Sequence, residues 1–71
     1  MPEAKEALKL IRKAKTVYAG TYLTSEDATY FPVSKIKVIE RLKKYINSDD
    51  KFVQGIQFNV RLEANGHAYI N

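Results

Sequence analysis

The tyrosines give this 71-residue chain its clearest chemical character, because four of the five lie in segments rich in β-branched and aromatic residues. Such segments favour β-strands, in which residues two apart share a face of the sheet. One face is therefore expected to carry Tyr18, Tyr22, Tyr30 and Tyr69, together with Arg61 and His67. Tyrosine rings stack on nucleobases, and a guanidinium group stacks on bases or binds phosphate. This set predicts binding of single-stranded nucleic acid.

The same tyrosine-rich face has two other interpretations. Tyrosine is a favoured strand residue whose ring covers its neighbours while its hydroxyl stays in water. Tyrosine and arginine are also enriched in protein interfaces, so a protein partner or a second copy of the chain fits equally well. In that case the protein would be a small regulator or inhibitor of the kind that mobile elements encode. All three interpretations depend on the register of the first hairpin, because a slip of one residue would turn the tyrosines into the core.

Basic residues form a second candidate surface. Lysine and arginine number 12 against 8 acidic residues, for a net charge of +4, and most of them fall in two helical segments. Two rows are spaced for one exposed helix face each: Lys5, Lys9 and Arg12, then Lys37, Arg41 and Lys44. Such rows can bind the phosphates of DNA or RNA, although lysine-rich helix faces also serve solubility alone.

The sequence offers little to catalysis, cofactors or metals. The only histidine, His67, lies near the expected end of a hairpin with no sign of a carboxylate partner. The adjacent acids Asp49 and Asp50 are too few for a calcium or magnesium site, and there is no cysteine for a thiolate site. We therefore expect a protein that is not an enzyme and has no cofactor or bound metal.

The chain also lacks an apolar run of the ~20 residues that a membrane-spanning helix needs. A chain without cysteine suits a reducing compartment, so a cytoplasmic protein without membrane contact is expected.

The elements that must position these residues follow from the hydrophobic spacing. Apolar residues recur at every second position over most of residues 51–63, which predicts a long strand with one apolar face. Helical spacing predicts helices over residues 2–15 and 34–46, the second with Ser34 as its N-cap. Further strands are expected over residues 16–23, 28–33 and 67–71, with a turn at residues 63–66.

These elements predict one α+β domain over residues 1–71. Their order is α-β-β-α-β-β, and the expected architecture is a four-stranded antiparallel sheet with two helices on one face.

Overall fold

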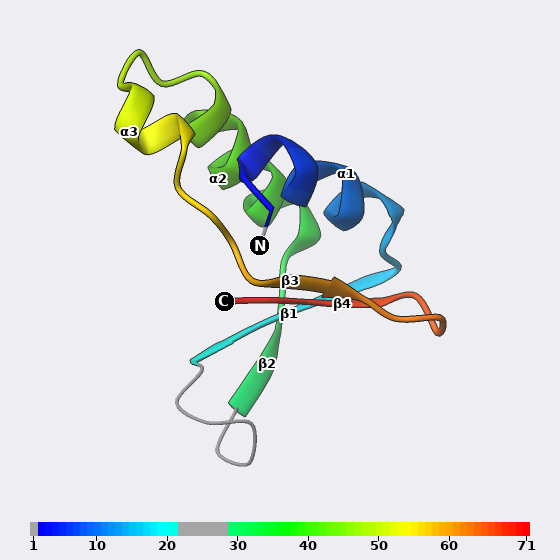
Figure 1. Ribbon diagram of the computed structural model, residues 1–71. Coiled ribbons are helices and arrows are strands. Elements are labelled where there is room, and N and C mark those ends of the chain that lie inside the picture. The colour runs from blue at the N-terminus through cyan, green and yellow to red at the C-terminus, as the bar shows by residue number, and fades with distance from the viewer. Residues whose placement is uncertain (1, 22–28) are drawn as a thin grey trace.

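The computed structural model describes residues 2–21 and 29–71 and shows an α+β domain (Figure 1). Its elements are α1 (Ala4–Lys13), β1 (Thr16–Thr21), β2 (Thr29–Val33), α2 (Lys35–Ile46), α3 (Lys51–Gln54), β3 (Val60–Leu62) and β4 (His67–Ile70). Helices α1 and α2 lie on the same side of the sheet, and no described helix covers its other side. The two-layer arrangement predicted from the sequence is therefore present.

Helix α1 packs through small side chains. Ala4, Ala7, Leu8 and Ile11 are buried at helical spacing, so one stripe of the helix faces the core. The helix is two residues shorter at each end than predicted, because the chain is extended at Glu3 and again at Ala14. The segment before the helix is tied to a distant part of the chain, since the carbonyl of Pro2 accepts a hydrogen bond from the Phe58 amide at 2.7 Å.

Helix α2 begins where the sequence predicts. The Ser34 hydroxyl accepts a hydrogen bond from the Lys37 amide at 3.3 Å, which caps the first turn. Leu42 is buried, and Val38, Ile39, Tyr45 and Ile46 pack around the same core. The apolar stripe of α2 therefore completes the layer that α1 begins.

The prediction of a fully antiparallel sheet is wrong. The strand order is β2-β1-β4-β3, and the two central strands, β1 and β4, run parallel. The two hairpins β1–β2 and β3–β4 are antiparallel, as expected. Turn residues specify pairing within each hairpin, but no local signal specifies which strands of the two hairpins meet. The sheet is therefore mixed.

The predicted long strand over residues 51–63 is also wrong. Its first part is the helical turn α3, which the Asp50 carboxylate caps by accepting a hydrogen bond from the Phe52 amide at 2.8 Å. Only Val60–Leu62 forms strand β3, so the order is α-β-β-α-α-β-β. Phe52, expected in the apolar face, is 80% exposed. Two helix signals flank α3, the acidic N-cap Asp50 before it and Gly55 after it. The apolar residues at every second position favoured a strand instead.

The turn over residues 63–66 forms as predicted. Gly66 takes a positive φ of 90°, whereas Asn65 does not. Asn65 instead uses its side-chain carbonyl to accept a hydrogen bond from the His67 amide at 2.9 Å.

Within residues 2–21 and 29–71, no helix has the length and apolar character needed to cross a membrane.

Candidate binding face of the sheet

Strand pairing brings Tyr18, Tyr30, Tyr69 and Arg61 together on the side of the sheet away from α1 and α2. Tyr18 in β1 lies directly opposite Tyr69 in β4, and Arg61 in β3 lies on the other side of Tyr69. Their neighbours in sequence, Val17 and Ala68, are buried beneath the helices. Because successive strand residues point to opposite faces, Tyr18 and Tyr69 point to the uncovered face.

The side chains on this face form one contiguous cluster. The rings of Tyr18 and Tyr69 are stacked, with centroids 5.3 Å apart and planes 17° apart. Tyr30 meets Tyr69 edge-on at 5.1 Å, and His67 lies 5.2 Å from Tyr18. The guanidinium carbon of Arg61 lies 4.7 Å from the centre of the Tyr69 ring. We call these five residues, Tyr18, Tyr30, Arg61, His67 and Tyr69, the aromatic face.

Gly20 makes room for one member of the aromatic face. Tyr30 comes from the edge strand β2 and must reach across β1 to touch Tyr69 in β4. Gly20 lies opposite Tyr30 on β1, and a Cβ atom at Gly20 would lie 2.8 Å from Cδ1 of the Tyr30 ring. The absence of a side chain at this position is therefore what allows Tyr30 to lean over β1.

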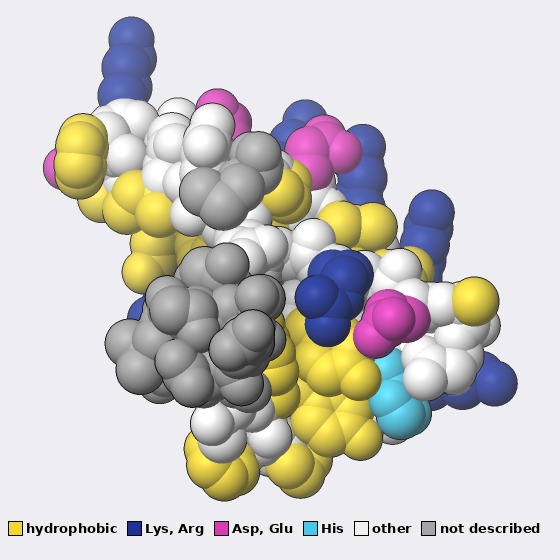
Figure 2. Space-filling view, turned by 60° about the horizontal axis from the view of Figure 1, so that its bottom comes forward, with side chains coloured by type: hydrophobic (Ala, Val, Ile, Leu, Met, Phe, Trp, Pro, Cys, Tyr) yellow, Lys and Arg dark blue, Asp and Glu magenta, His cyan; other side chains and the backbone are white. Residues whose placement is uncertain are grey.

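Charge is sparse on the aromatic face. Arg61 is its one cation, and Nη2 of Arg61 lies 3.8 Å from Oε1 of Glu63, with both side chains about half exposed. Exposed ion pairs of this length are weak, so Glu63 leaves the guanidinium available to a ligand. Figure 2 shows a yellow hydrophobic surface with a basic, an acidic and a histidine side chain along its border. The arrangement suits stacking, hydrogen bonding and contact with one or a few phosphates.

The structure assembles most of the predicted tyrosine set. Tyr18, Tyr30, Tyr69 and Arg61 are in mutual contact through Tyr69. Tyr22 lies outside the described residues. His67 belongs to the same cluster through its contact with Tyr18, as the alternation of strand residues predicts.

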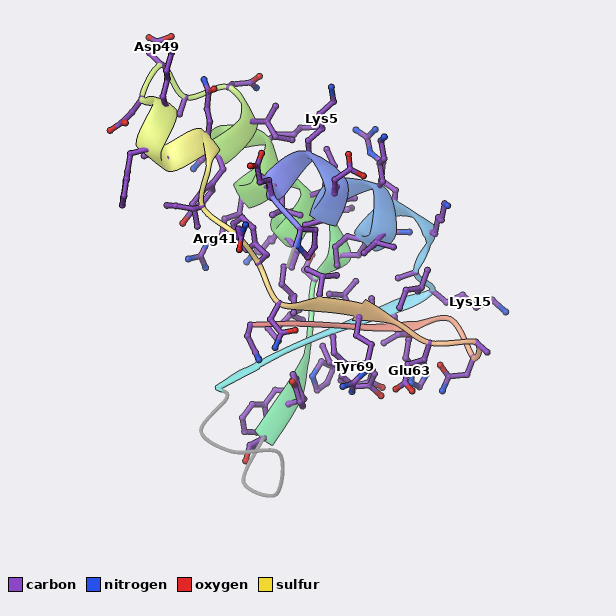
Figure 3. All side chains as sticks on the ribbon, in the orientation of Figure 1. Lys5, Lys15, Arg41, Asp49, Glu63 and Tyr69 are labelled. Carbon is purple, nitrogen blue, oxygen red and sulfur yellow. The ribbon has the colours of Figure 1, made fainter. Side chains whose placement is uncertain are left out.

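The six helix cations that the sequence singles out are exposed but do not converge on one site. Each of the six predicted cations is exposed: Lys5, Lys9, Arg12, Lys37, Arg41 and Lys44. Figure 3 shows Lys5 and Arg41 pointing away from the molecule in different directions. Lys9 also lies 3.7 Å from the carboxylate of Glu6, one turn away on α1. Lys5 of the first row and Arg41 of the second row therefore belong to separate surfaces. Of the predicted cations, Arg61 is the one that contacts a ring of the aromatic face.

One cation has a structural role that the sequence did not reveal. The ammonium group of Lys35 donates hydrogen bonds to the carbonyls of Arg12, at 2.9 Å, and Ala14, at 2.7 Å. It therefore joins the start of α2 to the end of α1. The bond partners are distant in sequence, so residue spacing could not predict this contact.

No group of three or more acidic or histidine side chains that could hold a metal ion occurs within the part of the chain that the structure describes.

Comparison with known proteins gives no match to any family model, any curated protein or any solved structure.

Proposed function

We propose that the protein binds single-stranded nucleic acid through the aromatic face. The observation that supports this most directly is the contiguous cluster of three tyrosines, a histidine and an arginine on the uncovered side of the sheet. Aromatic rings on an open sheet can stack with unpaired bases whatever the nucleotide sequence is. A neighbouring cation neutralises phosphates of the nucleic-acid backbone.

The contacts within the cluster assign different tasks to its members. Tyr69 is held between the stacked ring of Tyr18 and the guanidinium group of Arg61. Because these side chains already support one another, little side-chain entropy remains to be lost on binding. The outer rings, Tyr18, Tyr30 and His67, are the ones on which bases would stack, and Arg61 would bind a phosphate.

The salt dependence of binding separates the aromatic face from the basic helix rows. For single strands, log affinity falls by about 0.7 per neutralised phosphate for each unit of log salt concentration. Binding that depends on Arg61 alone predicts a slope between 0 and about −1, whereas binding through all six helix cations predicts about −4. The proposed mode is thus largely non-electrostatic, with stacking as its main source of affinity.

The test is a fluorescence titration with labelled single strands of roughly 12 nucleotides, within the range that small binding folds cover, and with the matching duplex. Tyr18→Ala should weaken single-strand binding about 5- to 160-fold, because stacking on one ring contributes about 1–3 kcal/mol. Arg61→Gln should also weaken it and flatten the salt slope. DNA and RNA strands are titrated in parallel.

Matched controls remove the same chemical groups elsewhere. Phe52→Ala deletes an 80% exposed aromatic side chain on α3, and Arg12→Gln neutralises an exposed arginine on α1. Both should leave affinity within twofold of the original protein. Preference for duplex together with a loss of binding in Arg12→Gln would assign binding to the helix layer instead. Absence of binding to any strand at low salt would overturn the proposal.

A protein-interaction role is the second candidate, and exposed apolar side chains support it. The described residues include four large hydrophobic side chains that are exposed: Phe31 at 64%, Val33 at 38%, Ile36 at 69% and Phe52 at 80%. None of them belongs to the aromatic face. Phe31 and Val33 lie opposite Ala19 and Val17 on β1, and Val17 is buried beneath the helices, so both point to the helix side of the sheet.

A further inference from the structure

An apolar groove runs along α2 on the helix side of the sheet. It consists of two adjoining hollows of about 220 and 420 Å³ that share Ala19, Val38 and Arg41 in their linings. Leu42, Phe58 and Ile70 line the smaller hollow, and Val33 and Lys37 line the larger one. We call this feature the α2 groove. Its described lining contains two cations and no acidic residue.

The end of the molecule formed by α3 carries a projection of complementary character. Phe52 is the most exposed of the large hydrophobic side chains described, and Asp49, Asp50 and Lys51 beside it are also exposed. Two carboxylates against one ammonium give the projection a net charge of −1. Figure 3 shows Asp49 pointing outward at the tip of this end. We call Asp49–Phe52 the α3 knob.

Hydrogen bonds hold the α3 knob in one shape. The Ser48 hydroxyl accepts from the Asp50 amide at 3.1 Å, and the Asp50 carboxylate accepts from the Phe52 amide at 2.8 Å. The side-chain amide of Gln54 also donates to the carbonyl of Ser48. A phenyl ring displayed on an ordered turn loses less entropy on binding than one on a mobile chain.

We propose that the α3 knob of one copy of the protein docks into the α2 groove of a second copy. An enclosed apolar cavity of about 150 Å³ accepts a benzene ring, so the smaller hollow, at about 220 Å³, has room for the Phe52 ring. Docking would bring the carboxylate of Asp49 towards Lys37 and Arg41. Each partner thereby covers an apolar surface that the single chain leaves exposed.

Charge favours this pairing over a symmetric contact between two grooves. Groove against groove would place Lys37 and Arg41 of both copies in one interface, where like charges repel. Knob against groove places opposite charges together instead. Because the knob and the groove are different surfaces, the contact is heterologous, and it closes only if the geometry allows a ring or a reciprocal pair. One side chain in one hollow covers less area than a stable interface, so the association is weak.

Sedimentation equilibrium over a wide concentration range tests the proposal. The average mass of the original protein should rise with concentration. Phe52→Ala, which truncates the knob, and Arg41→Glu, which reverses a groove charge, should each raise the dissociation constant at least tenfold. Ile36→Ala and Lys44→Glu are the matched controls, since both residues are exposed on α2 and line neither hollow. Circular dichroism of each variant confirms that it is folded.

A mixing experiment decides between knob-in-groove docking and any other self-association. The Phe52→Ala chain keeps an intact groove, and the Arg41→Glu chain keeps an intact knob. An equimolar mixture should therefore form a one-to-one complex, although each variant alone stays monomeric. A mixture that remains monomeric, or an original protein that remains monomeric at the highest concentration, would overturn the proposal. Equal mass gain in Arg41→Glu and the original protein would exclude the groove as the docking site.

These outcomes are independent of nucleic-acid binding, because neither the α3 knob nor the α2 groove shares a residue with the aromatic face. Addition of an acidic aromatic peptide with the sequence of residues 48–54 gives one further outcome. If the peptide binds the protein, although the protein without peptide stays monomeric at the highest concentration, the groove binds an acidic segment of another protein rather than a second copy.

Discussion

At the scale of single residues, Gly20 is the position where the sheet tolerates no side chain. A Cβ atom there would lie 2.1 Å from the carbonyl oxygen of Thr29 and 2.8 Å from the Tyr30 ring. The first contact is with backbone, so β1 and β2 would have to separate or shift. Gly20→Ala should therefore lower the free energy of unfolding by about 1–3 kcal/mol, the usual cost of overpacking, as measured by urea denaturation.

Gly55 provides the matched control for Gly20. A Cβ atom at Gly55 would meet its nearest atom, the Lys51 carbonyl oxygen, at 3.5 Å, and the backbone there has a φ of −86° that any residue can adopt. Gly55→Ala should leave stability unchanged or raise it by about 0.4–1 kcal/mol, because alanine restricts the unfolded chain. Equal destabilisation by the two substitutions would mean that the close contacts of a Cβ atom at Gly20 are not the cause of the loss of stability.

At the scale of elements, Lys35 couples the two long helices. Its ammonium group donates to carbonyls at the carboxyl end of α1, which is also the negative end of the helix dipole. Lys35→Met keeps most of the side-chain length but leaves the carbonyls of Arg12 and Ala14 without this donor. We expect the free energy of unfolding to fall by about 2 kcal/mol, the scale of a hydrogen bond to a charged group.

Lys37→Met tests whether charge alone explains that effect. Lys37 lies in the same first turn of α2, is exposed, and uses only its backbone amide in the hydrogen bond to Ser34. Its replacement should change stability by less than about 0.5 kcal/mol in the same denaturation measurement. A loss as large as that of Lys35→Met would show that the hydrogen bonds to α1 contribute little.

At the scale of the whole molecule, the core is small. Among the residues that the structure describes, the buried set contains four alanines and five larger side chains: Leu8, Ile11, Val17, Leu42 and Ile70. A domain of 71 residues typically has a free energy of unfolding of about 4–11 kcal/mol. Leu42→Ala should cost about 2–5 kcal/mol, so the thermal midpoint should fall sharply.

Ile36→Ala is the comparison for Leu42→Ala, since Ile36 is on the same helix but 69% exposed. Its midpoint should lie close to that of the original protein, because surface substitutions usually change stability by less than about 0.5 kcal/mol. Should both variants melt alike, the stability of the domain would have to come from somewhere other than the core around Leu42.

Local patterns in the sequence determined the two long helices and the orientation of the first strand. The apolar stripe of each helix and the Ser34 cap act within a few residues, so spacing alone located α1 and α2 to within two residues. The alternation in β1 likewise set Val17 towards the core and Tyr18 away from it. Most of the aromatic face was predictable for this reason.

Only the tertiary structure decided how the strands meet and what happens over residues 51–63. The parallel pairing of β1 with β4 joins residues about fifty positions apart. The sequence of neither strand specifies which other strand it pairs with. The period of two in residues 51–63 suited a strand, but the cap that Asp50 gives to Phe52 favoured a helical turn. The same turn places Phe52 on the surface, where it is 80% exposed.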